Sequence, residues 1–249
     1  MTVRFLGAGP GAADLVTVRA ARIIAASPVC LYAGSLVPRE LLDTCPPDAR
    51  VVDTARMTLD AIVDELITAT RAGLDVARVH SGDPSLYSAV AEQARRLDAA
   101  GVDYEIVPGV PAFAAAAAAL GRELTVPGIS QSVVLTRIST LSTAMPDGED
   151  LPTLAQSGAT LVIHLGARQI HTIVEQLSPH YGSDCPTAVV AFASRADEVI
   201  VRGTLADIAD ATVAAGIVKT AVVVVGRVLS AEGFPDSFLY SAARRRLDH

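Results

Sequence analysis

The residues best suited to chemistry lie together at positions 79–88, which read Val-His-Ser-Gly-Asp-Pro-Ser-Leu-Tyr-Ser. Gly82 lets a ligand approach the backbone, the Asp83 carboxylate offers fixed hydrogen-bond acceptors, and Pro84 stiffens the turn. Such a turn suits the binding of a small polar ligand. The alternative is an ordinary connection between a strand and a helix, in which Asp83 only caps the helix.

Two elements would position this turn. Residues 75–79 read as a short buried strand, and residues 85–97 read as an amphipathic helix. In open α/β sheets, ligands collect beyond the carboxyl ends of strands, where the backbone N–H groups at the start of the next helix are unpaired. The pattern therefore predicts a ligand site at the carboxyl end of this strand.

A glycine-rich turn, Gly-Ala-Gly-Pro-Gly at 7–11, follows a predicted strand at 3–6 and precedes a predicted helix at 14–25. It is similar to a dinucleotide-binding fingerprint, but Ala12 stands at the third glycine position and no acidic residue ends the next strand. Pro10 also lacks an N–H that would help to hold a pyrophosphate. We expect a close-approach turn for another ligand, with nucleotide phosphate binding as the alternative.

The first half of the chain carries three more predicted strands, at 29–32, 50–53 and 104–107, and a helix at 58–72. Turns suited to ligand contact follow the first, second, fourth and fifth strands of this half. Because the carboxyl ends of parallel strands meet at one edge of a sheet, these turns predict a single ligand-facing edge.

The second half begins after a break at 121–128 that is typical of a linker. Its expected strands are 132–137, 160–165, 187–193, 198–202 and 221–226, with a helix at 168–177. A polar loop at 138–150 has the composition of a mobile segment or lid. The short connection between the third and fourth strands favours antiparallel pairing. We therefore expect two α/β domains, an N-terminal one at 1–121 and a C-terminal one with a mixed sheet at 122–249.

The composition argues against several classes of protein. A net charge of -7 and a single lysine, Lys219, argue against nucleic-acid binding, which needs clustered basic residues. The longest apolar run, at 110–120, is too short to span a bilayer, and no export signal is seen, so we expect a cytoplasmic protein without a membrane partner. The cysteines and histidines are scattered, so no protein-held metal site is expected.

The motifs, taken in order, resemble those of the tetrapyrrole (precorrin) methyltransferases. The matching segments are 7–11 with 14–17, 32–37, 79–84, 106–110 and 131–137. The Tyr-Ala-Gly-Ser-Leu-Val turn at 32–37 and the Glu-Leu-Thr-Val-Pro linker at 123–127 are most similar to those of the precorrin-4 C11-methyltransferases of cobalamin (vitamin B12) biosynthesis. The resemblance runs from Met1 to about Tyr240. It implies two α/β domains with S-adenosylmethionine (SAM) held in a trough between them, and a homodimer.

On this resemblance, the expected reaction is SAM-dependent methylation of a precorrin, at C11 of precorrin-4, giving precorrin-5 and S-adenosylhomocysteine (SAH). One alternative is the cobalt-containing precorrin-4 of the anaerobic branch, and another is a different precorrin position. The sequence looks closer to the metal-free, oxygen-dependent branch. From other classes, a nicotinamide- or flavin-dependent oxidoreductase and a noncatalytic ligand-binding module stay open.

The resemblance also implies a set of cofactor-binding residues. They are Pro10, Ser81, Gly82, Asp83, Leu86, Tyr87, Ala112, Phe113, Leu165, Ala193, Thr220 and Ala221. Two of them depart from the family pattern, because Leu165 stands where relatives often have Met and Phe113 stands where a small residue is common.

The chemistry asks little acid or base work of the protein, because the sulfonium of SAM already carries its leaving group. An in-line attack by a ring carbon mainly needs close approach, alignment and exclusion of water, so no catalytic acid or base is predicted. A substrate rimmed with carboxylates needs cations, for which arginine is well suited. The candidates are Arg137, Arg122, Arg168 and Arg195, and Arg137 is favoured because it ends a strand just before the polar loop. A solvated surface arginine is the alternative for each.

Overall fold

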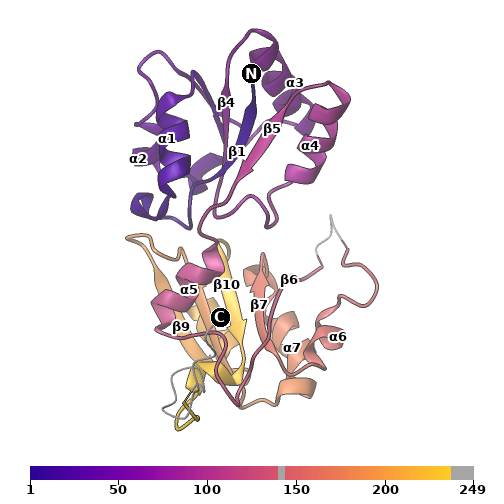
Figure 1. Ribbon diagram of the computed structural model, residues 1–249. Coiled ribbons are helices and arrows are strands. Elements are labelled where there is room, and N and C mark those ends of the chain that lie inside the picture. The colour runs from indigo at the N-terminus through magenta and orange to yellow at the C-terminus, as the bar shows by residue number, and fades with distance from the viewer. Residues whose placement is uncertain (140–143, 237–249) are drawn as a thin grey trace, which may run out of the picture. The chain divides into compact units, whose positions relative to one another are not determined.

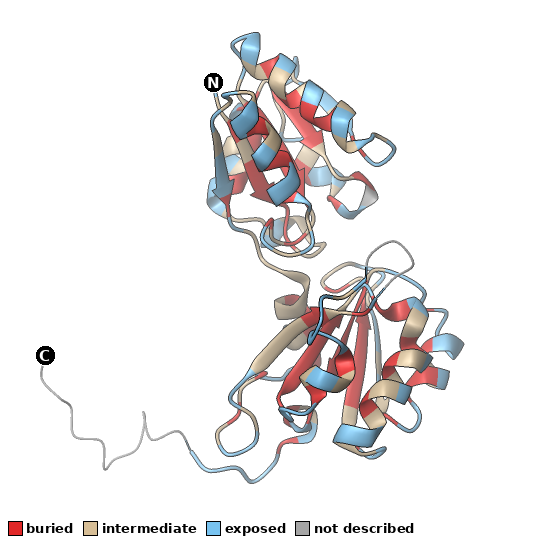
Figure 2. Cartoon of the chain, turned by 90° about the vertical axis from the view of Figure 1, so that its right-hand side faces the viewer, coloured by how far each residue is buried: buried red, intermediate tan, exposed pale blue. Residues whose placement is uncertain are grey.

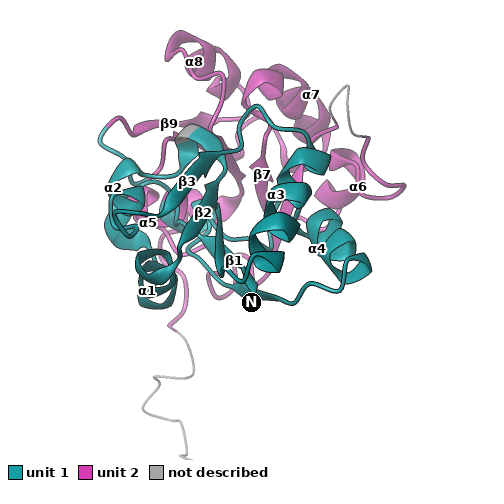
Figure 3. Ribbon diagram, turned by 90° about the horizontal axis from the view of Figure 1, so that it is seen from above, with its two compact units in different colours: residues 1–115, 194–196 teal, residues 116–193, 197–249 magenta. Residues whose placement is uncertain are grey.

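The computed structural model describes residues 1–139 and 144–236. By contacts between residues, the chain divides into two compact units (Figure 3). Unit 1 contains residues 1–115 and 194–196, and unit 2 contains 116–193 and 197–249. The boundary falls inside helix α5 (Ala112–Leu120), a few residues before the predicted linker. That the segments 1–121 and 122–249 are separate folding domains stays a prediction.

Unit 1 is built on a five-stranded sheet in the order β3-β2-β4-β1-β5. Its strands are β1 (Val3–Gly7), β2 (Val29–Tyr32), β3 (Arg50–Asp53), β4 (Val76–His80) and β5 (Tyr104–Val107). Every pairing is parallel, so all five carboxyl ends lie at one edge, as the sequence predicted. The central strand β4 is buried along its whole length, in keeping with a parallel sheet that is covered on both faces.

Helices cover both faces of this sheet (Figures 1 and 2). On one face lie α1 (Val18–Ala26) and α2 (Arg39–Leu42), and on the other lie α3 (Leu59–Arg71) and α4 (Val90–Ala99). The apolar stripe of α3 places Leu66 in the core with no exposed surface, a burial that stabilises the fold by about 1.5–3 kcal/mol. Its start is fixed by Thr58, whose hydroxyl accepts a hydrogen bond from the N–H of Ala61 at 3.2 Å.

Unit 2 has a mixed five-stranded sheet in the order β6-β7-β10-β8-β9. Its strands are β6 (Val133–Arg137), β7 (Thr160–His164), β8 (Pro186–Ala191), β9 (Val199–Thr204) and β10 (Ala221–Val225). Only β6 and β7 pair in parallel, and the predicted antiparallel pairing of β8 with β9 is confirmed. The expected α/β class with a mixed second sheet is therefore confirmed.

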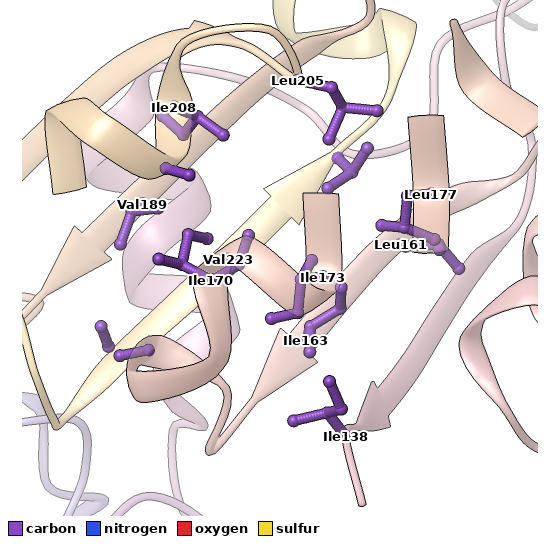
Figure 4. Packing of buried hydrophobic residues seen from close by; sticks show 14 of the residues in the cluster. Ile138, Leu161, Ile163, Ile170, Ile173, Leu177, Val189, Leu205, Ile208 and Val223 are labelled. Carbon is purple, nitrogen blue, oxygen red and sulfur yellow. The ribbon is translucent and has the colours of Figure 1, made fainter. Parts of the chain in front are cut away.

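The core of unit 2 lies between this sheet and the helices α7 (Ile170–Tyr181) and α8 (Ile208–Ala214) (Figure 4). Ile163 and Val223 from neighbouring strands pack there with Ile173 of α7, and all three are fully buried. Helix α6 (Leu151–Ala155) adds Leu151 to the same cluster. None of the helices within the described residues is long and apolar enough to cross a membrane.

Three expectations about local structure differ from the fold. The helix expected at 85–97 begins only at Val90, because Tyr87 and Ala89 adopt positive φ angles of 54° and 51° that no α-helix allows. The helix expected at 14–25 is a 3-10 turn (Ala13–Leu15) followed by α1, which begins after the capping residue Thr17. In unit 2, the helix expected at 168–177 begins as a 3-10 turn and continues to Tyr181.

The polar loop predicted at 138–150 is described only in part, since residues 140–143 lie outside the described residues. Both of its ends are fixed. Ile138 is buried in the core of unit 2, and the Asp150 carboxylate accepts a hydrogen bond from the N–H of Thr153 at 2.9 Å, which caps α6. Its role as a lid stays a prediction.

Candidate functional site

Three loops of unit 1 meet closely at the carboxyl edge of its sheet, after β1, β4 and β5. The N–H of Gly82 donates to the carbonyl of Gly9 at 2.7 Å, which joins the first two loops. A Cβ atom added to Gly109 would lie 2.3 Å from the carbonyl oxygen of Gly82 and 2.7 Å from the Cα of Gly7. Real Cβ atoms do not come this near, so glycine is required where these backbones touch.

Asp83 ties two of these loops together. Its Oδ2 accepts a hydrogen bond from the N–H of Gly109 at 2.6 Å, and its Oδ1 accepts from the N–H of Ser85 at 2.8 Å and from the Ser85 hydroxyl. Burial alone raises the pKa of Asp83, but these hydrogen bonds outweigh it, and the pKa lies below its usual value. Because no helix begins at Ser85, the idea that Asp83 is only a helix cap is wrong. Three bonds fill three of the roughly four acceptor positions of a carboxylate, which leaves room for a ligand donor.

The loop that follows Asp83 is strained. Tyr87 and Ala89 both have positive φ, a conformation that costs a non-glycine residue on the order of 1 kcal/mol or more. The Tyr87 ring is nonetheless 45% exposed, although aromatic side chains usually lie in the interior. Strain and an exposed aromatic ring in one loop are typical of a ligand-binding segment.

Unit 2 has a comparable edge. Register places the carboxyl ends of β7 and β8 beside the amino end of β10, because Val222 pairs with His164 and Ala221 pairs with Ala191. Leu165 follows β7 with φ of 58° and is 63% exposed. Positive φ angles also occur on this edge at Phe192 and Thr220, and Ser194 has one in the segment 194–196, which belongs to unit 1. Every non-glycine residue with positive φ among those described thus belongs to, or lies within two residues of, a predicted cofactor-binding position.

The structure brings the predicted cofactor residues together within each unit. Those of unit 1 lie in the loops after β1 and β4 and in the first turn of α5, where the N–H of Ala112 would lie 3.8 Å from a Cβ added to Gly82. They are Pro10, Ser81, Gly82, Asp83, Leu86, Tyr87, Ala112 and Phe113. Those of unit 2 lie on the edge just described and are Leu165, Ala193, Thr220 and Ala221. Their contact with a cofactor stays a prediction.

Two of the four candidate arginines lie at this edge of unit 2. Arg137 ends β6 and pairs in register with His164. Its guanidinium donates to the carbonyl of Ile138 at 3.3 Å and to that of Ala144 at 3.0 Å. Arg168 is exposed in the 3-10 turn (Ala167–Gln169) that follows β7.

The other two candidates are placed differently. Arg195 belongs to the segment 194–196 of unit 1, where the hydroxyl of the neighbouring Ser194 accepts from the N–H of Ala12 at 3.0 Å. Arg122 lines a pocket beside Arg202 and the amino end of β8, which is the opposite edge of the sheet of unit 2. Within unit 2, the structure therefore does not bring Arg122 together with Arg137 and Arg168.

Sequence reasoning missed a buried polar cluster beneath the edge of unit 1. Thr54, Arg78, His80 and Gln93 are between 2% and 5% exposed. Arg78 donates from Nε to Oε1 of Gln93 at 3.1 Å and from Nη1 to Oγ1 of Thr54 at 3.0 Å. A signal was present in the sequence, because Arg78 interrupts an otherwise apolar strand, where a charged residue is rarely buried without a partner.

Burial controls the charges in this cluster. It lowers the pKa of Arg78 to about 10, which leaves the guanidinium protonated at neutral pH. It also lowers the pKa of His80 to about 3, with a smaller contribution from the positive charge of Arg78, so His80 is neutral. The His80 ring packs against Phe5 with ring centroids 5.9 Å apart, and its Nε2 has no hydrogen-bond partner among the described residues.

Comparisons with known proteins agree with the resemblance in the motifs. The chain is 73% identical over all 249 residues, and over the full length of both chains, to the precorrin-4 C(11)-methyltransferase of Rhodococcus erythropolis. The X-ray structure of a cobalt precorrin-4 methyltransferase matches with a TM-score of 0.89 at 39% identity, covering 92% of this chain and 95% of that one. The uroporphyrin-III C-methyltransferase of Thermus thermophilus, in complex with SAH, matches with a TM-score of 0.78 at 28% identity, covering 92% and 99%.

The profile of one protein family matches most of the chain. It is that of the tetrapyrrole (corrin/porphyrin) methylases, and the match spans residues 2–209, which include both sheets except for β10. This match agrees with the full-length relatives and with the strained loops found in both units. The chain belongs to the tetrapyrrole methylase family.

Proposed function

We propose that the chain transfers the methyl group of SAM to C11 of precorrin-4 in cobalamin biosynthesis. The observation that carries the proposal is the full-length identity to the precorrin-4 C(11)-methyltransferase of Rhodococcus erythropolis, which leaves no segment of either chain unmatched. The loop edges of the two units support it, because each carries an exposed residue with a strained backbone, Tyr87 or Leu165, as ligand-binding loops often do.

The residues present fit SAM. On the unit 1 edge, the remaining acceptor position of Asp83 suits an amino or ribose hydroxyl donor. Exposed apolar groups on the two edges, the Tyr87 ring and the Leu165 side chain, suit the flat faces of an adenine. We therefore propose that the predicted cofactor residues of both units bind SAM.

Bound SAM supplies a methyl group on a positively charged sulfur, which leaves as a neutral thioether when a carbon nucleophile attacks. The chain has to orient the two reactants and to keep water away from the reacting carbon. Asp83 is suited to orientation rather than to proton transfer, because its low pKa makes it a poor base at neutral pH. The neutral, buried His80 is not a strong base either.

Recognition of the carboxylates of a precorrin would fall to arginine. Arg137 and Arg168 share the strand edge that carries Leu165, so both are suited to pair with an anionic rim. We favour Arg137, since its donors to the carbonyls of Ile138 and Ala144 hold the guanidinium at the end of β6. Arg122 is less suited, because it lies at the opposite edge.

We further propose that the substrate carries no metal. The chain is 73% identical to the precorrin-4 C(11)-methyltransferase of Rhodococcus erythropolis and 39% identical to the cobalt precorrin-4 methyltransferase of known structure. Supplying both substrates under anaerobic conditions tests this choice. Faster turnover of the metal-free ring supports the proposal, and a preference for the cobalt-containing ring contradicts it.

A thermal-shift experiment tests the class of cofactor. SAH at about a hundred times its dissociation constant should stabilise the protein by roughly 2.7 kcal/mol, whereas NAD and flavin nucleotides should not. Stabilisation by NAD alone would favour an oxidoreductase. A protein stabilised by none of them would favour a noncatalytic module for another ligand.

We also propose a cytoplasmic homodimer. The edge strand β9 exposes Val199 and Ile200 by 37% and 36%, as a strand that packs on a second copy would. Cys30, Cys45 and Cys185 are free thiols, which fits a reducing compartment. Light scattering in solution and fractionation of the native cells test the two proposals, and a monomer or an exported protein would contradict them.

A further inference from the structure

Three members of the buried cluster of unit 1, Thr54, Arg78 and Gln93, form a continuous network of hydrogen bonds between two backbone carbonyls. From Arg78 on β4, one branch runs through the hydroxyl of Thr54, which donates to the carbonyl of Tyr32 at 2.9 Å. The other branch runs through Gln93 on α4, whose Nε2 donates to the carbonyl of Ala89 at 2.9 Å. This network of hydrogen bonds therefore runs from the end of β2 to the residue just before α4.

Such a cluster is expensive to bury. Removing a charged group from water costs several kcal/mol even after the protein relaxes, and a buried charge is therefore usually paired with an opposite charge. No carboxylate among the described residues forms an ion pair with Arg78, whose bonded partners are neutral oxygens. Apolar residues of similar volume would pack this position without the penalty. The cluster is therefore unlike the rest of the core in unit 1.

Both ends of this network of hydrogen bonds are backbone carbonyls near the carboxyl edge of the sheet of unit 1. That of Ala89 lies in the candidate-site loop after β4, and that of Tyr32 belongs to the last residue of β2. Tyr32 precedes the 3-10 turn (Gly34–Leu36), and its carbonyl also accepts from the N–H of Thr54 at 3.0 Å. Ala89 has a φ of 51° and closes the strained loop that contains Asp83 and Tyr87. A donor fixed on Ala89 opposes relaxation of that loop toward ordinary backbone angles.

We propose that Arg78, with Thr54 and Gln93, is a positioning device that holds the loop 81–89 and the turn after β2 in the conformation that binds cofactor. This inference rests on the proposed function, because the conformation of these loops matters for binding only if they bind SAM. Arg78 itself does not touch the reactants. It acts through the carbonyls of Tyr32 and Ala89, with Arg78 on β4, Thr54 directly after β3 and Gln93 on α4.

Gln93→Glu separates this role from simple core packing. Glutamate keeps an oxygen for Arg78 and adds the missing negative charge, but it has no N–H to donate to Ala89. The variant should therefore unfold at the same temperature as the wild type or higher. Its affinity for SAH, measured by calorimetry, should nonetheless fall about fivefold, as expected for the loss of a hydrogen bond of ~1 kcal/mol.

Thr54 offers a matched pair of variants. Thr54→Val keeps the shape of the side chain but removes the hydroxyl, and Thr54→Ser keeps the hydroxyl. The valine variant should lose SAH affinity about fivefold, and the serine variant should restore most of it. Thr70→Val is the control, because its hydroxyl donates only to carbonyls of Leu66 and Ile67 within α3, away from the loops. It should change stability without changing SAH affinity.

Amide hydrogen exchange without ligand tests the device independently of the function. Exchange in the loop 81–89 should be about tenfold faster in Gln93→Glu and Thr54→Val than in the wild type or Thr70→Val. Unchanged exchange and unchanged SAH affinity in both variants would reduce the cluster to core packing and overturn the inference. A wild-type protein that binds no SAH would contradict the proposed function instead, while the exchange rates would still decide whether the cluster positions the loop.

Discussion

The N–H of Gly109 donates to Oδ2 of Asp83 at 2.6 Å, a bond between residues that lie in the loops after β5 and β4. It makes Asp83 a structural tie as well as a candidate ligand contact. The carboxylate that orders the loops is then also the one that we propose accepts a hydrogen bond from the cofactor. Loss of its charge should therefore be felt in binding more than in folding.

Asp83→Asn should weaken SAH binding by roughly 1.5–3 kcal/mol. An amide oxygen is a weaker hydrogen-bond acceptor than a carboxylate oxygen, and the amide NH2 group would face the N–H of Gly109 or of Ser85, which is also a donor. Calorimetry measures the change. Asp75→Asn is the matched control, since Asp75 also has a lowered pKa, chiefly from the N–H of Thr2, but lies at the opposite edge of the sheet. Equal affinity of wild type and Asp83→Asn would restrict Asp83 to a structural role.

Gly109→Ala should lower both stability and SAH affinity, because its Cβ would meet the backbone of Gly82 and Gly7. We expect a loss of stability of about 2 kcal/mol or more, in the range of an overpacked core. Gly101→Ala has no atom within 4 Å of its Cβ and is strained only by its positive φ, so it should lose less and bind SAH normally. Urea unfolding measures the stability of the two variants, and calorimetry measures their affinity for SAH. Similar losses in both variants would argue against the close contact at Gly109.

The buried His80 should make stability depend on pH. Its pKa is about 3 in the folded protein, whereas an unperturbed histidine has a pKa of 6.5, so between these values only the unfolded chain binds the proton. The contribution of His80 to the free energy of unfolding is therefore fully present above pH 6.5. It falls by ~1.4 kcal/mol per pH unit as the pH is lowered toward 3. His80→Leu should remove that part of the slope in urea unfolding between neutral and mildly acidic pH, and the exposed His171→Leu should not. An unchanged slope in His80→Leu would show that His80 is not buried as described.

Arg137→Ala tests recognition of the substrate. If the guanidinium pairs with a precorrin carboxylate, kcat/KM should fall some thirtyfold, or roughly 2 kcal/mol, while SAH affinity is unchanged. Arg202→Ala is the control, because Arg202 also donates to a backbone carbonyl, that of Leu120, but lies at the opposite edge. Normal turnover by Arg137→Ala would remove it from the site, and equal losses of cofactor and substrate binding would indicate a structural role.

Local patterns in the sequence were enough to predict the strands, but not their order in the two sheets. All ten strands lie within two residues of their expected bounds, because runs of buried apolar residues between glycine and proline turns mark them. The parallel edge of unit 1 followed from the alternation of strands and helices. The twelve cofactor positions came from the family resemblance, and the structure gathers them within each unit.

What could not be predicted depends on contacts between residues far apart in the chain. Tyr87 and Ala89 have no intrinsic preference for positive φ, so the helix start at Ser85 was placed too early. The tie between Asp83 and Gly109 and the hydrogen bonds of Arg78 join segments that meet only in the folded sheet. The sequence shows that Arg78 is out of place in an apolar strand, but not what it bonds.

Methylation of C11 of precorrin-4 by this chain can be observed directly. The most direct measurement supplies SAM with a methyl group enriched in the NMR-active carbon isotope, together with precorrin-4, and locates the label in the product by NMR. We expect one labelled methyl group on C11 and one SAH for each ring converted. A label on any other ring carbon, or no transfer from SAM to precorrin-4, would contradict the proposed function.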